Sequence, residues 1–159
     1  MKEIYKNLYV GSLSDCSYEI NEGWVVIHAC KSPCHQYAVG YRGNLFKTHP
    51  NYLILEQESH LFLNMVDMNV PLDHRYTGPI INTTMNFIQK NIQTKNVLIH
   101  CNQGLSRSPV LALIYLAKRA NIINNESYEM AKTDFIRIFP NYQPGSGLNY
   151  YLIQHWNQL

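Results

Sequence analysis

The sequence feature that most constrains the fold is a polar loop at residues 100–108, set between two apolar segments. Before it stands the apolar run Val97-Leu98-Ile99, which is typical of a central strand buried on both faces. After it, residues 109–119 are apolar nearly all round, which predicts a buried helix with Pro109 in its first turn. A strand, a short loop and a helix in this order aim backbone N–H groups and a helix N-terminus at one point. The segment therefore predicts an anion-binding turn.

Two residues give this turn a reactive centre. A thiol at the position of Cys101, near a helix N-terminus and a cation, ionises well below its usual pKa of about 8.5. Arg107 follows six positions later, where its planar guanidinium can fold back and hold two oxygens of a phosphate. Gly104 lets the backbone turn tightly, and Ser106 and Ser108 add hydroxyl donors. A buried structural cysteine beside a surface arginine accounts for this combination less well.

The run His100-Cys101-x5-Arg107-Ser108 resembles the signature of the dual-specificity branch of the protein tyrosine phosphatase superfamily. Residues 7–12 are similar to the opening strand of that family. Phe139-Pro140-Asn141, with Arg137 just before it, is similar to a region near the end of the family's domain. The resemblance thus covers most of the chain.

The resemblance implies a metal-independent phosphatase without cofactors that hydrolyses phosphomonoesters through a phosphocysteine. Cys101 would be the nucleophile, Arg107 would hold the phosphoryl group, and Ser108 would help the sulfur to leave. His100 would orient the loop through hydrogen bonds. The residues that would bind the substrate phosphate are Asn102, Gln103, Gly104, Leu105, Ser106 and Arg107.

The rest of the sequence predicts one α/β domain over residues 1–159, with a central, mostly parallel sheet of about five strands flanked by helices. Strand-like apolar runs lie at residues 8–10, 24–27, 52–55 and 61–66. Helical spacing of apolar residues follows at 77–92, 126–138 and 148–157. Alternation of the two patterns is typical of a layered fold.

The chain departs from the family within residues 30–60, where we expect an insertion of roughly twenty residues, a length that a surface loop tolerates. It contains Lys31, Arg42 and Lys47, and one interpretation is a flap that contacts substrate near the catalytic mouth. The alternative is a solvated surface excursion. The sequence leaves both open.

The general acid has two candidates ahead of the signature, Asp67 and Asp73. Family spacing falls between them. We favour Asp67, because it follows the apolar run 61–66 toward the sheet edge at which Ile99 ends. Asp73 lies farther along a polar loop beside Arg75, where a turn or helix cap is the more common role, and it is kept as the alternative.

A zinc site can be considered for His28, Cys30, Cys34 and His35. Cys34 and His35 are adjacent, however, and no second Cys-x2-Cys pair follows, so we expect no metal. Spacing does not decide whether Cys101 forms a disulfide with Cys30 or Cys34 on oxidation.

The remaining sequence properties limit which partners and which cellular location we expect. No signal segment and no apolar run of about twenty residues is found, so we expect a cytoplasmic monomer with reduced thiols and no membrane contact. A formal charge of +2 does not favour nucleic acid. The expected partner is a phosphorylated protein or a small phosphoester. The uncharged Asn102, Gln103, Leu105 and Ser106 favour a phosphoprotein over a polyphosphoinositide.

Other functions stay open. A small-metabolite, lipid or RNA 5′-phosphate substrate would use the same loop, and a pseudophosphatase would bind phosphorylated partners without turnover. Such binding modules usually lose the cysteine or the arginine, and Cys101 and Arg107 are both present. A thiol oxidoreductase of the arsenate reductase type also uses a Cys-x5-Arg loop, but there the loop normally lies near the N-terminus.

Overall fold

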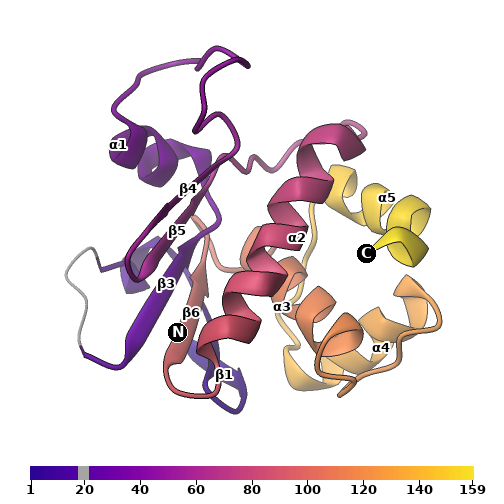
Figure 1. Ribbon diagram of the computed structural model, residues 1–159. Helices are drawn as coiled ribbons and strands as arrows, with labels where there is room; N and C mark the ends of the chain where they lie inside the picture. Colours follow the sequence, from indigo (N-terminus) through magenta and orange to yellow (C-terminus); the bar gives the residue numbers. More distant parts are fainter. Residues whose placement is uncertain (18–21) are drawn as a thin grey trace.

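The computed structural model describes residues 1–17 and 22–159. Its centre is a six-stranded sheet with the order β1-β2-β6-β3-β5-β4 (Figure 1). The four inner strands are parallel, and each edge strand pairs antiparallel with its neighbour. The strands are β1 (Lys2–Tyr5), β2 (Leu8–Gly11), β3 (Trp24–His28), β4 (Ile54–Gln57), β5 (His60–Leu63) and β6 (Asn96–His100). The predicted α/β class with a mostly parallel sheet is confirmed.

Four long helices gather on one side of this sheet (Figure 1). They are α2 (His74–Asn91), α3 (Arg107–Lys118), α4 (Tyr128–Ile138) and α5 (Ser146–His155). Helix α3 packs on β6 and β2 below and on α2 and α4 beside it, so every residue from Ser108 to Ala117 is buried. This surrounding explains why its sequence is apolar nearly all round.

The predicted element ends shift by a few residues. Helix α3 begins at Arg107, so Pro109 is its third residue, where the absent N–H is still not needed. Strand β5 ends at Leu63 rather than near Val66, because the chain turns there and the N–H of Met65 donates to the carbonyl of Leu63 (2.8 Å). Helix α5 begins at Ser146, and the 3-10 turn η3 (Trp156–Gln158) follows it.

Strand alternation gives the sheet two different faces. Val25 and Ile27 of β3, with Val97 and Ile99 of β6, point into the main core beneath the four helices. His28 and His100 end the same two strands, and the alternation turns their side chains to the opposite face. There a smaller apolar cluster forms from Cys30, Cys34 and Phe62, with Cys16, Ala38 and Leu55 packed against it.

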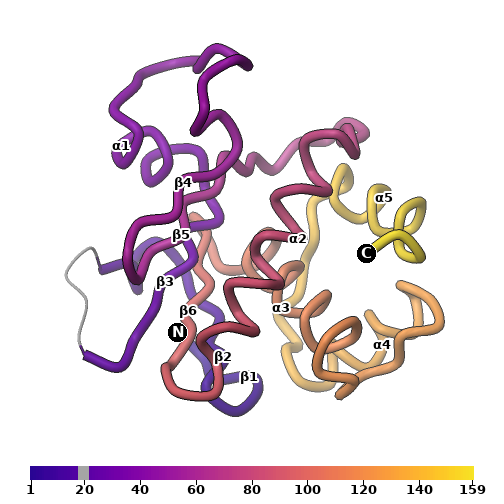
Figure 2. The backbone as a smooth tube through the Cα atoms, viewed as in Figure 1, coloured from indigo at the N-terminus to yellow at the C-terminus, as the bar shows by residue number. Residues whose placement is uncertain are grey.

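Within residues 30–60, here called the 30–60 segment, the part that precedes β4 rises beyond one end of the sheet as a long excursion (Figures 1 and 2). It contains the π-helical turn η2 (Lys31–His35), the short helix α1 (Gln36–Val39) and a long connection to β4. The buried His35 ring fixes this connection, since its nitrogens bond the Tyr41 hydroxyl (2.9 Å) and the Asn51 carbonyl (3.0 Å). Hydrogen bonds of a buried histidine therefore hold this part of the chain in place.

Among the described residues, no helix is long and apolar enough to cross a membrane.

Candidate active site

The loop that carries Cys101 (residues 101–107, the Cys101 loop) joins β6 directly to α3 and packs against the end of β2. Gly11 is the contact point, because its carbonyl accepts from the N–H of Cys101 (3.4 Å) and from the Ser108 hydroxyl (3.2 Å). Gly104 has a φ of +75°, and a Cβ there would lie 2.9 Å from the same carbonyl. Glycine is thus required both by the backbone conformation and by the packing.

The Cys101 sulfur is buried and is surrounded by donors. It accepts hydrogen bonds from the backbone N–H of Gly104 (3.3 Å) and from the hydroxyl of Ser108 (3.2 Å). Burial by itself raises the pKa of the Cys101 thiol, but these bonds and the charge of Arg107 outweigh it and lower the pKa below its ordinary value. The arrangement favours a thiolate at the centre of the loop.

Arg107 lies at the mouth of the same loop. Its two terminal nitrogens donate to the Met65 carbonyl (3.1 Å) and to Oδ1 of Asn102 (2.9 Å). Its Nε is buried and has no hydrogen-bond partner among the described residues. A buried donor of this kind calls for an acceptor, and an oxygen of a phosphoryl group on the Cys101 loop would supply one.

Asp67 lies on the irregular stretch after β5 (residues 64–70, the Asp67 loop), with its carboxylate exposed and packed against Gly145. A Cβ added to Gly145 would overlap that carboxylate. The N–H of Gly147 donates to the Met68 carbonyl (3.0 Å), and the Ser146 hydroxyl donates to the Asn69 side chain (3.2 Å). The start of α5 therefore holds the Asp67 loop in place.

The same stretch, residues 143–147 (the bridging segment), also contacts the Cys101 loop. The N–H of Gly145 donates to the Ser106 hydroxyl (2.8 Å), and the N–H of Gln143 donates to the Leu105 carbonyl (2.8 Å). One residue, Gly145, thus touches both loops. Sequence reasoning missed this segment, and its only signal was the run of turn-forming residues Pro144-Gly145-Ser146-Gly147 between two helices.

Asp73 has a different environment. It is the N-cap of α2, and its carboxylate accepts from the N–H of Arg75 (2.9 Å) and pairs with the Arg75 guanidinium (2.6 Å). Hydrogen bonds from Arg75 lower the pKa of Asp73 to about 2. The Asp73 carboxylate is therefore engaged as a helix cap and as the ion-pair partner of Arg75.

A groove of about 520 Å³ opens beside the Asp67 loop, and no residue of the Cys101 loop lines it. Met65 and Lys31, which line the groove, connect it to Arg107. The Met65 carbonyl accepts from Arg107 and also from the backbone N–H of Lys31 (3.0 Å). The 30–60 segment contributes Lys31, Lys47 and Tyr52 to its lining, and Lys47 and Tyr52 contact the ring of Tyr76 in α2. The Asn102 side chain also donates to the Ser32 carbonyl (3.3 Å), so this segment reaches the Cys101 loop itself.

The four residues considered for zinc do not come together as one group. His35 is engaged by Tyr41 and Asn51, as described above, and Cys30 lies outside the cluster that His28 and Cys34 join. In their place, Cys16 and His100 approach His28 and Cys34. The four cysteines, all within the described residues, form no disulfide.

Comparison with known proteins agrees with this geometry. The family model of the dual specificity phosphatase catalytic domain matches residues 25–151, so the chain belongs to the dual specificity phosphatase family of the protein tyrosine phosphatase superfamily. The family's cysteine-dependent, metal-independent mechanism is consistent with the Cys101 loop.

Among curated proteins, the chain is 29% identical over 143 residues to human dual specificity protein phosphatase 16, covering 87% of this chain and 19% of that protein. Dual specificity protein phosphatase 8 from human is 29% identical over 79 residues, covering 47% of this chain and 13% of that protein. The chain spans less than a fifth of the length of either relative.

Two solved structures show the same fold. The human tyrosine phosphatase-like serine/threonine/tyrosine-interacting protein has a TM-score of 0.65 at 20% identity, covering 98% of this chain and 94% of that one. Human DUSP28 has a TM-score of 0.59 at 14% identity, covering 98% and 94%.

Proposed function

We propose that this chain hydrolyses phosphomonoesters on tyrosine, serine or threonine of proteins through a phosphocysteine formed on Cys101. The observation that carries the proposal is the Cys101 sulfur, buried at a helix N-terminus, with donors from Gly104 and Ser108 and the Arg107 guanidinium beside it. These groups stabilise an anionic sulfur and a bound phosphoryl group alike.

In the first step the Cys101 thiolate attacks phosphorus, so that an S–P bond forms and the P–O bond to the substrate breaks. Arg107 holds two of the equatorial oxygens, where charge is spread in the transition state. We assign the proton for the leaving oxygen to Asp67. Its exposed carboxylate packs against Gly145, and the N–H of Gly145 donates to Ser106 of the Cys101 loop.

In the second step water attacks phosphorus and the S–P bond breaks. Asp67, now a carboxylate, takes the proton from that water. The departing thiolate accepts the hydrogen bond of the Ser108 hydroxyl, which lowers the energy of the leaving group. Inorganic phosphate leaves, and the enzyme returns to its starting protonation state.

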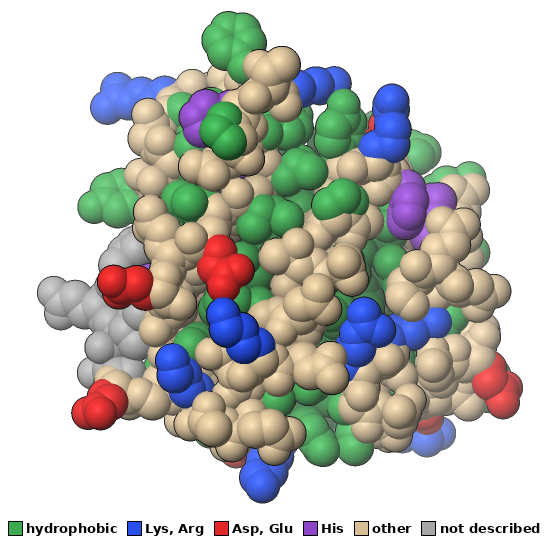
Figure 3. All heavy atoms as spheres, viewed as in Figure 1, with side chains coloured by type: hydrophobic (Ala, Val, Ile, Leu, Met, Phe, Trp, Pro, Cys, Tyr) green, Lys and Arg blue, Asp and Glu red, His purple; other side chains and the backbone are tan. Residues whose placement is uncertain are grey.

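A phosphoprotein is favoured as substrate by the surroundings of the loop. The exposed loop side chains Asn102 and Gln103 are uncharged, and the adjoining groove offers room for residues that flank a phosphorylated side chain. On the face drawn in Figure 3, Lys and Arg side chains are dispersed rather than gathered into a basic stripe, which disfavours nucleic acid.

All residues of this mechanism come from one chain, so we propose that a monomer over residues 1–159 suffices. The absence of a disulfide among the four cysteines supports a reducing, cytoplasmic location.

A substrate panel tests the proposal. It would compare p-nitrophenyl phosphate, phosphopeptides, a phosphoinositide and an RNA 5′-phosphate as substrates for the wild type and for Cys101→Ser. We expect phosphopeptide hydrolysis by the wild type and a loss of at least about 10⁴-fold in Cys101→Ser, since a hydroxyl is not ionised at neutral pH. Phosphopeptide binding without turnover by the wild type would instead identify a binding module. Strong preference for the phosphoinositide would overturn the substrate class alone.

A further inference from the structure

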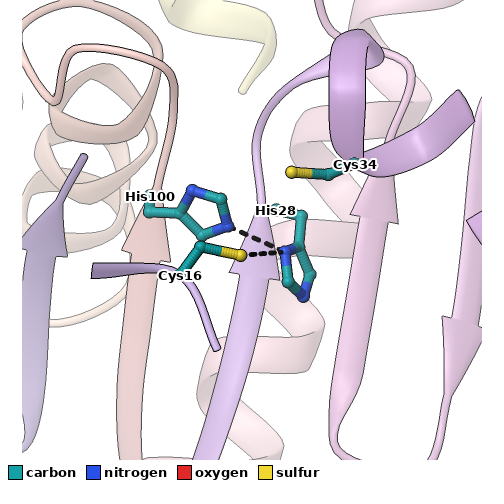
Figure 4. Close-up of side chains that lie close together, drawn as sticks. All are labelled: Cys16, His28, Cys34 and His100. Carbon is teal, nitrogen blue, oxygen red and sulfur yellow. Dashed lines mark hydrogen bonds between the residues drawn. The ribbon is translucent and has the colours of Figure 1, made fainter. Parts of the chain in front are cut away.

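A second group of reactive side chains lies just behind the catalytic loop. Cys16, His28, Cys34 and His100, here called the Cys–His cluster, place one nitrogen or sulfur each within 4.8 Å of all the others (Figure 4). Three of the four are fully buried, and Cys16 is partly exposed. The reaction assigned to Cys101 uses none of the four ligand atoms.

The fold explains why they meet. His28 and His100 end the adjacent parallel strands β3 and β6 and are direct partners in the register, on the face of the sheet opposite the four helices. Cys16 follows the 3-10 turn η1 (Leu13–Asp15), and Cys34 belongs to η2. Figure 4 shows Cys16 and His100 directed at the same ring nitrogen of His28, with Cys34 above them. Three segments near the N-terminal end and the end of β6, 72 positions after His28, therefore converge on one point.

We propose that the Cys–His cluster binds one Zn²⁺ ion. Two thiolates and two imidazoles form a donor set typical of structural zinc, and their two negative charges match the ion in a buried place. The proposed role is structural: the ion would tie the loops that carry Cys16 and Cys34 to the two central strands. The ion takes no part in phosphoryl transfer.

Zinc binding would require the four ligand atoms, now within 4.8 Å of one another, to rearrange toward tetrahedral spacing. Tetrahedral zinc sets ligand pairs about 3.3 Å apart for two nitrogens and about 3.5 Å for a sulfur and a nitrogen. Cys16 Sγ lies 3.5 Å from His28 Nδ1, and His100 Nε2 lies 2.7 Å from the same nitrogen. The two rings would have to separate by about 0.6 Å to admit the ion between them.

The surroundings of the two imidazoles give independent support. The other nitrogen of His28, Nε2, lies 2.9 Å from Nδ1 of His60, which is the kind of outer hydrogen bond that orients a metal-bound histidine. His100 Nδ1 is buried, points away from the Cys–His cluster (Figure 4) and has no hydrogen-bond partner among the described residues. With Nε2 on the metal, the ring proton would reside on Nδ1, beside the Cys101 loop.

Metal analysis tests the proposal. The full chain carrying Cys101→Ser would be used, so that the catalytic thiolate does not bind the ion. After dialysis against zinc and then a metal-free buffer, we expect about one zinc per chain, and cobalt in its place should give thiolate charge-transfer and tetrahedral bands. Cys34→Ser and Cys16→Ser should each lose the ion. Cys30→Ser is the matched control, because Cys30 is equally buried beside the Cys–His cluster yet outside the four-atom set, and it should keep the ion.

Two further measurements distinguish a zinc site from four side chains that are joined by hydrogen bonds alone. His60→Phe should weaken zinc binding by about 10- to 100-fold, because it removes the outer hydrogen bond to His28 while it keeps a ring against His28 and Phe62. Zinc should raise the melting temperature of the control but not that of Cys16→Ser, whose partly exposed position makes it the variant to use if Cys34→Ser does not fold.

Three results would overturn the proposal: a chain that retains no zinc, zinc content that is the same in Cys16→Ser and the control, or an intact mass that shows a disulfide between Cys16 and Cys34 in the native protein.

Discussion

The Cys101 loop and the Asp67 loop lie at the same end of the sheet, but different parts of the chain fix them. The Cys101 loop runs straight from β6 into α3, and the donors to its sulfur, Gly104 and Ser108, follow within seven positions. The Asp67 loop has no helix or strand of its own, and it is bonded to the bridging segment up to 79 positions later.

The donors to the proposed nucleophile therefore come from the neighbouring sequence, whereas the proposed acid is held by residues far along the chain. Substitutions within the Cys101 loop should therefore act on the chemistry of sulfur and phosphate. Substitutions in the bridging segment that keep its hydrogen bonds to Ser106 and Leu105 should act mainly through Asp67.

The largest effect is expected for Arg107→Lys, because an ammonium group cannot reproduce the two-pronged contact with phosphate oxygens. We expect kcat to fall about 10³-fold. Arg75→Lys is the matched control, since its partner Asp73 is an exposed helix cap, and it should change kcat by less than about twofold. Steady-state kinetics with a phosphotyrosine peptide measures both. A kcat for Arg107→Lys within about threefold of the wild type would contradict the role of Arg107.

The next effect concerns the acid. Asp67→Asn should lower kcat about 10²-fold on a phosphopeptide, whose leaving oxygen needs a proton. It should cost much less with p-nitrophenyl phosphate, and the alkaline limb of the pH–rate profile should disappear. Asp73→Asn should leave rate and profile nearly unchanged, because that carboxylate is held by Arg75. If Asp73→Asn instead removes the alkaline limb, the alternative acid is the correct one.

Gly145→Ala tests the distant support of the Asp67 loop. The backbone of Gly145 has a φ of −57°, which alanine adopts freely, but the added methyl group would overlap the Asp67 carboxylate. We expect a loss of about 30-fold in kcat through misplacement of the acid. Ser146→Ala, which removes only the hydrogen bond to Asn69, should cost about twofold.

The double variant Gly145→Ala, Asp67→Asn isolates the mechanism of that loss. With the acid already absent, the alanine should have little further effect. A full, additive loss in the double variant would mean that Gly145 acts through Ser106 and the Cys101 loop instead.

Apart from the control variants, the smallest effect is expected for Ser108→Ala, at about tenfold in kcat. The Ser108 hydroxyl lowers the pKa of Cys101, and the thiolate is the reactive form. Loss of this donor raises that pKa, so activity should be lost sooner as the pH falls, and the acidic limb of kcat/KM should move to higher pH. Ser106→Ala, whose hydroxyl bonds Gly145 rather than the sulfur, should leave that limb in place. An unmoved acidic limb in Ser108→Ala would contradict this assignment.

The two loops also differ in how much of them the sequence could predict. The Cys101 loop could be predicted from the segments on either side of it, the apolar run Val97-Leu98-Ile99 and the apolar helix. Both are continuous in sequence and buried on all sides. The contact of Gly145 with Asp67 and the meeting of Cys16 with His100 were missed, because each joins segments that only the sheet order brings together. His28, Cys30, Cys34 and His35 are neighbours in sequence, but the strand register places His28 beside His100, 72 positions later.

The measurement that tests the central claim most directly is identification of the covalent intermediate. The wild-type chain would be mixed with a phosphotyrosine peptide, quenched in acid during turnover and digested for mass spectrometry. We expect a phosphoryl group on the sulfur of Cys101, in the peptide that contains the Cys101 loop, and none in Cys101→Ser. Steady turnover with no phosphoryl group on Cys101, or with one on another residue, would contradict the account.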